Sequence, residues 1–243
     1  MTTAQDFLPQ LASISESFHE AKTKYMNDHK TFQVGKDARL TIYTRCLLVI
    51  DNALLYLVFQ TFDIPSDSWW DTLSKIFTEL GINPLTQKPS PDNRKSIMAT
   101  LNIYWQYSAF IVLVSTLESF ARTIVRKAYP GKCNDGRGKI MDIYNRLLGR
   151  KFSNYECLLK LLTLGRNTMH NNGVYFPNRK GDNRHVTYKN VAYDFIDGQS
   201  VQYGNLTKLV FFDIAPDMLK MINDIVNSPK VSIHAQIIDP SEK

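Results

Sequence analysis

A long helical pattern across residues 91–129 limits the folds that are open to this chain. Its middle, YSAFIVLVSTL, is apolar on every side of a helix, and a helix of this kind has to be surrounded by other apolar groups. The apolar stretch is too short, and too often interrupted by polar residues, to predict a membrane span. We therefore expect residues 107–118 to form the core of a central helix in a bundle.

Most of the remaining chain follows the same period of about 3.6 residues, which predicts helices. A short helix is expected to begin at the N-cap Ser66 and to stop at Gly81, before a proline-bearing loop over residues 82–93. The other predicted helices cover residues 4–29, 37–61, 138–149, 153–170 and 206–227.

The period changes to 2 after Gly173, where HVTYKN, VAYDFI and SVQYG are typical of short strands. Asp197-Gly198 is a strong hairpin turn, and KVSIHAQIID is expected to add a last strand. The sheet has too few residues for a core of its own. The sequence therefore predicts one mainly α domain over residues 1–243, with a small antiparallel β-hairpin insertion at about 177–205, between the last helices.

Cysteine usage and the chain start favour a cytoplasmic protein. Cys46, Cys133 and Cys157 are odd in number and have no CxxC spacing, which fits reduced thiols better than a disulfide framework. The first residues have no basic start followed by an apolar core, so neither export nor membrane insertion is expected.

Positive charge is concentrated in one part of the sequence. The chain has a net charge of +6, whereas residues 122–189 hold 15 Lys and Arg against four Asp and Glu, a net +11. Such asymmetry favours a surface that binds a polyanion, most commonly nucleic acid. The alternative is a set of solvated helix faces whose charges scatter in space. The candidate nucleic-acid contacts are Arg122, Arg126, Arg146, Arg150, Lys151 and the aromatic Tyr175, which could instead pack under the hairpin.

The segment RNTMHNNGVYF places Arg166 and His170 on one face of a helix. A simple explanation is available, because cations stabilise the last turn of a helix and NNG is a good C-cap. A second pair, Arg179 and His185, flanks the turn-rich KGDNR and is attributed to chance.

Glu118 distinguishes the first pair from the second. Steps of three and four residues back from Glu118 meet a largely apolar stripe that predicts a carboxylate at the edge of the core. Its residues are Ser115, Ile111, Ser108, Tyr104, Leu101 and Ile97. A carboxylate there needs a cation. Arg122, one turn later, is the local candidate, and an arginine from the motif helix is the functional one.

LGRNTMHNNG and STLESFAR resemble the HEPN family (higher eukaryotes and prokaryotes nucleotide-binding domain). The resemblance implies an α-helical bundle, often a homodimer, and a metal-independent RNase that needs no cofactor. By position, Arg166, Asn167 and His170 match the family's arginine, polar residue and histidine, and Glu118 matches the acid of a neighbouring helix. Three residues separate Arg166 from His170, fewer than is usual in the active motif.

The resemblance also implies a chemistry and partners. His170 would move protons, Arg166 would stabilise charge on the phosphorane, Asn167 would donate to a phosphate oxygen and Glu118 would orient Arg166. One chain supplies one motif histidine, so a two-fold dimer would supply both acid and base. The implied role is a toxin or defence effector acting on RNA, released from an antitoxin or another regulatory protein.

A structural interpretation of the same residues is the alternative. Asn167 could cap the helix and His170 could satisfy a core polar group, which would leave a non-catalytic module that binds RNA or a protein. The sequence has no GxSxG elbow, no GxGxxG or phosphate-loop motif and no histidines at metal-ligand spacing.

Overall fold

The computed structural model describes residues 4–32, 35–63, 66–80 and 90–240. Within them the protein is mainly helical and carries a small two-stranded antiparallel sheet, as predicted. The α-helices, in chain order, are α1 (Ala4–Asp28), α2 (Ala38–Val58), α3 (Asp67–Glu79), α4 (Pro91–Ala128), α5 (Ile140–Leu148), α6 (Glu156–His170), α7 (Ala215–Val226) and α8 (Pro229–Ser232). Shorter segments are the π-helices η1 (Phe59–Asp63) and η4 (Lys208–Ile214) and the 3₁₀ helices η2 (Cys133–Gly136) and η3 (Gly149–Asn154).

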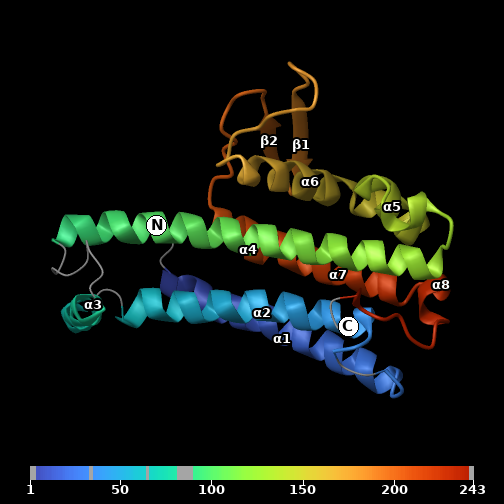
Figure 1. The fold of residues 1–243 in the computed structure, drawn as a ribbon, viewed down its shortest axis with the longest axis horizontal. Helices are drawn as coiled ribbons and strands as arrows, with labels where there is room; N and C mark the ends of the chain where they lie inside the picture. The colour runs from blue at the N-terminus through green and yellow to red at the C-terminus, as the bar shows by residue number, and fades with distance from the viewer. Residues whose placement is uncertain (1–3, 33–34, 64–65, 81–89, 241–243) are drawn as a thin grey trace.

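The helices form layers around α4, which is the longest of them (Figure 1). One side of α4 packs on α2, which in turn packs on α1, and the other side is covered by α5 and α6. The two strands rise from the α6 side, away from α1 and α2 (Figure 1). The site helices α4 and α6 are therefore neighbours although about fifty residues of sequence separate their facing positions.

The prediction of a central helix is confirmed for α4. The side chains that it buries follow helical spacing and join the main core. They include Ala109, Phe110, Leu113, Val114 and Leu117.

The stripe that precedes Glu118, in contrast, is largely exposed, although Ile111 packs against the core. Tyr104 is 67% exposed, and Ser108 and Ser115 on the same face are exposed as well. Periodicity shows that one helix face is apolar, but it does not show which faces other elements cover. Glu118 is partly buried because α5 and α6 lie over it, and the first half of this face remains open.

Helix ends follow local sequence signals. Ser66 caps α3, as predicted, and its hydroxyl accepts a hydrogen bond from the backbone N–H of Trp69 at 3.2 Å. Gly81 and the proline-bearing loop predicted after it lie largely outside the described residues. The segment predicted as helix 37–61 ends in the π-helix η1, and the segment 206–227 contains the π-helix η4 before α7.

The hairpin turns at a different place from the predicted one. β1 (Arg184–Tyr188) pairs with β2 (Val191–Phe195), so Lys189 and Asn190 form the two-residue turn. Both have positive φ, 48° and 63°, which is the backbone of the turn type that matches the twist of two strands. The prediction of a turn at Asp197-Gly198 is therefore wrong for this sheet.

Asp197-Gly198 makes another reversal, directly after β2. The N–H of Gln199 donates to the carbonyl of Ile196 at 3.0 Å, and the chain then runs beside residues 173–175. Tyr175 donates to the carbonyl of Gln199 at 3.0 Å, so the third strand-like run pairs with the end of the α6 motif as an isolated bridge.

The predicted last strand in KVSIHAQIID is wrong, since residues Pro229–Ser232 form the short helix α8. Proline presets the first turn of a helix, and buried Arg39 binds the carbonyls of Val231 and His234 at 3.0 and 2.9 Å. The segment also pairs with the start of α2, through the bridge of Ile238 to Asp37 and the hydrogen bond from the N–H of Ala38 to the carbonyl of Ile237 at 2.7 Å.

Two segments, Ala38–Thr61 and Pro91–Ala128, are long and apolar enough to cross a membrane by length and composition. Their most apolar windows are 39% and 50% buried inside the fold. Core helices of soluble bundles share this length and composition, so the finding does not assign either segment to a membrane.

The thiols differ strongly in their surroundings. Cys46 is fully buried, and burial raises its pKa to about 12, whereas Cys157 is exposed. The thiolate is the reactive form, so we expect a thiol reagent at pH 8 to label Cys157 in the folded protein and Cys46 only on unfolding. Mass spectrometry of labelled peptides checks this order, and labelling of Cys46 in native buffer would contradict it.

Candidate functional site

One carboxylate joins two arginines from different helices. Glu118, on α4, accepts hydrogen bonds at Oε1 from Nε and Nη2 of Arg122, at 3.1 and 2.8 Å. Its other oxygen, Oε2, pairs with Nη1 of Arg166 on α6. The two partners that the sequence offered as alternatives are thus both present. We call Glu118, Arg122 and Arg166 the arginine cluster.

Arg122 also holds the loop that follows α4. Its Nη1 donates to the carbonyls of Gly136 at 2.6 Å and Gly138 at 3.0 Å. This loop contains three consecutive non-glycine residues with positive φ, Cys133–Asp135, a conformation that is strained for residues other than glycine. Arg122 therefore ties a strained loop to the candidate site, a contact that the sequence did not indicate.

The cluster is closed on one side by α5. Tyr144 is buried, and its burial, followed by the negative charge of Glu118, raises the pKa of its hydroxyl. The side chains of Arg166 and Glu118 keep 30% and 17% of their surface exposed. The cluster is therefore partly shielded from water, and Coulombic interactions there are stronger than on an open surface.

Helix α6 runs antiparallel to α4 and approaches it closely at glycines. A Cβ at Gly165 would lie 2.8 Å from the ring of Phe110, and one at Gly173 would lie 3.1 Å from the hydroxyl of Tyr107. This approach brings Arg166 onto Glu118. Nε of Arg166 is buried and has no hydrogen-bond partner among the described residues.

His170 occupies the last turn of α6, four residues after Arg166, and is exposed. Among the described residues none makes a hydrogen bond or an ion pair with it, so it does not satisfy a core polar group. Asn167 is exposed too, and its carbonyl accepts a hydrogen bond from the side chain of Asn171 at 2.9 Å. Both side chains face solvent, next to the cluster.

The helix end is built by the residues after His170. Asn171 is the C-cap of α6, and Asn172 and Gly173 have positive φ of 54° and 85°, so NNG is the predicted cap. Thr168 bonds to the hydroxyl of Tyr203, and burial raises the pKa of that tyrosine to about 12. The motif turn is thus anchored from a second side, by a residue beyond the hairpin.

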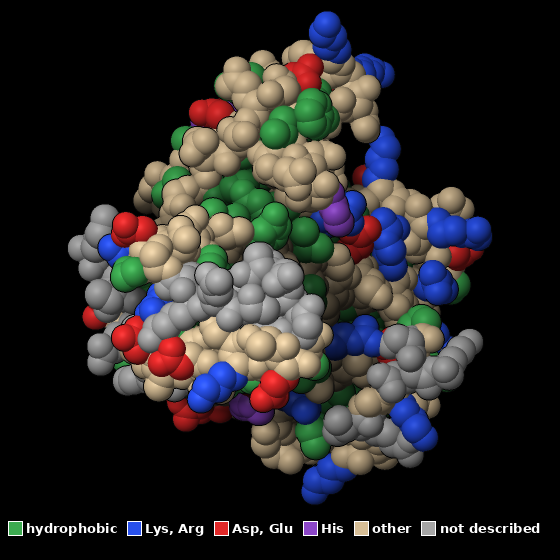
Figure 2. All heavy atoms as spheres, turned by 60° about the vertical axis from the view of Figure 1, so that its left-hand side comes forward, with side chains coloured by type: hydrophobic (Ala, Val, Ile, Leu, Met, Phe, Trp, Pro, Cys, Tyr) green, Lys and Arg blue, Asp and Glu red, His purple; other side chains and the backbone are tan. Residues whose placement is uncertain are grey.

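The basic residues predicted to contact nucleic acid differ in whether other described side chains or carbonyls bind them. Arg146 and Arg150 are exposed and make no hydrogen bond or ion pair with another described residue, whereas Lys151 pairs with Asp224 at 2.6 Å. Arg126 uses Nε on the carbonyl of Asp135, at 3.2 Å. Figure 2 shows Lys and Arg side chains gathered along one side of this face, below the hairpin, with a histidine among them.

Tyr175 is buried and packs edge to face on Phe195, with ring centroids 5.6 Å apart. Tyr175 therefore packs under the hairpin, and its ring is not available to stack on a nucleotide. Phe176, next to it, is 58% exposed.

Arg179 and His185 are not brought into the cluster. His185 faces Asp194 across the hairpin, with 2.6 Å between Nδ1 and Oδ1, and both side chains are more than half exposed. Arg179 is exposed in the loop before β1. This second pair provides matched substitutions outside the candidate site.

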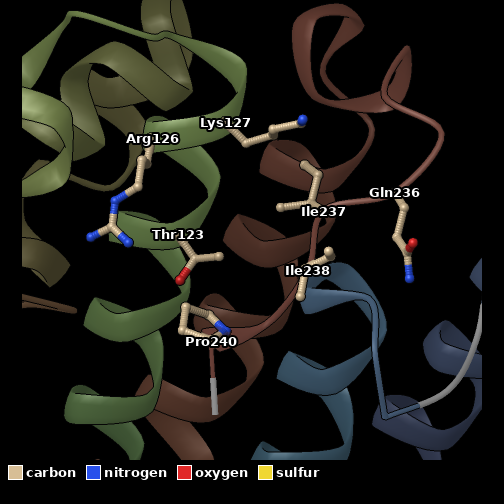
Figure 3. Close-up of a pocket in the computed structure, with 7 residues that line it drawn as sticks. All are labelled: Thr123, Arg126, Lys127, Gln236, Ile237, Ile238 and Pro240. Atoms are coloured by element: carbon tan, nitrogen blue, oxygen red, sulfur yellow. The ribbon is translucent and has the colours of Figure 1, made fainter. Parts of the chain in front are cut away.

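A pocket of about 440 Å³ lies between the end of α4 and the C-terminal segment. Arg126 and Lys127 line it, but Figure 3 shows them extending from α4 in different directions. They do not converge on one point, as the cations of an anion site do. Within the described ranges, no group of three or more His, Cys, Asp or Glu side chains could hold a metal ion.

No family model, curated protein or solved structure matches the chain. The functional argument therefore rests on the geometry of the site and on the residues that form it.

Proposed function

We propose that this protein is an HEPN-like, metal-independent endoribonuclease. One observation carries the proposal: Glu118 of α4 pairs with Arg166, and His170 stands exposed one turn further along α6. An oriented guanidinium beside an exposed imidazole supplies two of the groups that cleavage of a phosphodiester without a metal requires. The guanidinium stabilises negative charge, and the imidazole transfers protons near neutral pH.

The reaction assigns one step to each group. His170 accepts the proton of a ribose 2′-hydroxyl as that oxygen attacks the phosphorus. Arg166 and the amide of Asn167 donate to the non-bridging oxygens, on which charge develops. The P–O5′ bond breaks, and the leaving 5′-oxygen receives a proton from a second acid. The products are a 2′,3′-cyclic phosphate and a 5′-hydroxyl.

A second copy of the chain supplies that second acid in this proposal. Among the described residues, one protomer brings a single histidine to the arginine cluster. The uncovered face of α4 fits a homodimer contact, because Leu101, Tyr104 and Val112 are 45%, 67% and 47% exposed there. In the cell the protein would act on RNA in the cytoplasm as a toxin or defence effector, under control of an antitoxin or another regulatory protein.

The basic test is cleavage of RNA in the presence of a chelator. We expect EDTA to leave the activity unchanged and the new 3′ ends to be cyclic phosphates. RNA binding should weaken steeply as salt rises, since Lys and Arg displace condensed counterions. Inhibition of cleavage by EDTA, reversed by added metal, would contradict the mechanism, and salt-independent binding would contradict the polyanion surface.

A second candidate is a non-catalytic module that binds RNA or a protein. Arg166 favours it, because its pairing with Glu118 also stabilises the contact between α4 and α6. This candidate predicts salt-dependent binding with no cleavage of any RNA.

A further inference from the structure

A second cavity, of about 530 Å³, lies against the first half of α4 and away from the arginine cluster. Its walls come from α1, from the end of α2 with the π-helix η1, from α4 and from the segment just before the π-helix η4. π-Helical turns are rare and are frequent at functional sites. Two of them flank one cavity here, and its volume is within the range of small-molecule sites.

The lining carries no charged side chain among the described residues. Four of the residues that line it are amides, Gln60, Asn102, Gln106 and Asn205. A phosphate or carboxylate ligand would need a cation, and an ammonium ligand would need a carboxylate. The cavity therefore suits a neutral group that both donates and accepts hydrogen bonds.

Hydrogen bonds fix the orientation of two of these amide side chains. Nε2 of Gln106 donates to Oδ1 of Asn102 at 3.2 Å and to Oγ1 of Thr207 at 2.7 Å. Thr207 is buried, so Gln106 is anchored from a second element. These bonds leave Oε1 of Gln106 as an acceptor and Nδ2 of Asn102 as a donor, and no described residue occupies either. Gln106 and Asn102, whose side chains are hydrogen-bonded to each other, therefore offer one acceptor and one donor side by side.

The surface of the cavity is mainly polar, and one aromatic side chain lines it. Phe7 contributes the ring, whereas Leu57 and Leu206 are almost fully buried and add little surface. An adjacent donor and acceptor beside an aromatic ring match a flat ligand that has a polar edge. Nucleobases have this chemistry, and Asn and Gln are the side chains that pair with a base edge through two hydrogen bonds.

We propose that this cavity binds a nucleobase, with Gln106 Oε1 accepting from the edge of the base and Asn102 Nδ2 donating to it. The base could belong to a free nucleoside or to an RNA strand, because the recognised edge is the same. The cavity is separate from the arginine cluster, so base binding does not depend on RNA cleavage.

Calorimetric titration of the full chain with adenosine, guanosine, cytidine and uridine tests the proposal. We expect saturable binding of at least one nucleoside and no binding of ribose 5-phosphate. Asn102→Leu should weaken that binding by about 10-fold or more, which corresponds to one lost hydrogen bond to a buried partner. Gln60→Leu removes an amide that has no described partner and provides a second variant with little risk to folding.

Controls separate the cavity from other effects. Gln236→Leu changes an exposed amide that lines the pocket of Figure 3 and should leave nucleoside binding unchanged. Arg166→Ala should leave it unchanged as well, so loss of cleavage and loss of base binding can be told apart. Circular dichroism and thermal melting confirm that each variant folds.

A short oligonucleotide distinguishes the two sources of the base. If nucleosides do not bind but the oligonucleotide binds and Asn102→Leu weakens it, the base of an RNA strand is the ligand. Binding of neither, binding that both amide variants leave unchanged, or displacement of the bound nucleoside by ribose 5-phosphate would overturn the proposal. Saturable binding of a dipeptide amide in place of every nucleoside would also overturn it.

Discussion

Replacement of Arg39 by methionine is expected to destabilise the protein by about 3–5 kcal/mol, because it leaves the carboxylate of Asp37 buried without its cation. Both side chains are 0% exposed, with 2.6 Å between Nη2 and Oδ2. Arg39 also lies 3.9 Å from the ring centre of Phe32 and binds two carbonyls near α8. Its loss would therefore also remove two of the hydrogen bonds that join the C-terminal segment to the start of α2. Urea and thermal unfolding measure the effect, and the melting temperature should fall by on the order of 10 °C.

Two comparisons make this prediction specific. The double variant Asp37→Asn/Arg39→Met should recover part of the loss, since it removes the unpaired charge and keeps a capping side chain. Lys160→Met breaks the exposed pair with Glu156, at 2.8 Å, and should change stability by less than about 1 kcal/mol. An Arg39→Met protein as stable as the parent would show that the buried pair contributes nothing.

His170→Ala and Arg166→Ala are each expected to remove most RNA cleavage. Loss of a proton-transferring group costs about 10²–10⁴-fold in rate, and loss of a donor to developing charge costs about 10²–10³-fold. His170 is exposed and has no described partner, so its substitution should leave the melting temperature unchanged. Arg166→Ala frees Glu118 to pair with Arg122 alone, so a modest loss of stability should accompany its loss of activity.

The matched controls are Arg179→Ala and His185→Ala, which change the same residue types outside the arginine cluster. Both should cleave RNA at the parent rate. If His170→Ala folds, binds RNA and cleaves like the parent, the catalytic role is wrong. If the parent binds RNA but never cleaves it, the non-catalytic module becomes the better description.

Most of the helical architecture was predictable, because it depends on local periodicity and on caps such as Ser66. The hairpin was predictable as two short alternating strands, but its turn was not. Asp-Gly is the stronger turn sequence, yet the pairing of Val186 with Tyr193 places the turn at Lys189 and Asn190. Burial of one strand face decided the register, and a local turn signal does not report that burial.

The sequence predicted those contacts of the site that a partly buried charge requires. A carboxylate at the edge of a core needs a cation, which led from Glu118 to both Arg122 and Arg166. The hydrogen bonds of Arg122 to the η2 loop and of Tyr203 to Thr168 were not predictable, because no sequence pattern pairs an arginine with those loop carbonyls or that tyrosine with that threonine. The amide cavity was missed for the same reason, since its residues come from four separate parts of the chain.

The formal charge of the arginine cluster is set by its stoichiometry. One carboxylate faces two guanidinium groups, so the three side chains sum to +1. A single phosphodiester would bring that sum to zero, and a second one would make it negative. Removal of either arginine gives a neutral pair, whereas Glu118→Gln gives +2 and sets two like charges against each other. Under the proposed function, the cluster would therefore hold one phosphodiester at a time, and the number of arginines per carboxylate, rather than the total basicity of the surface, would set that limit.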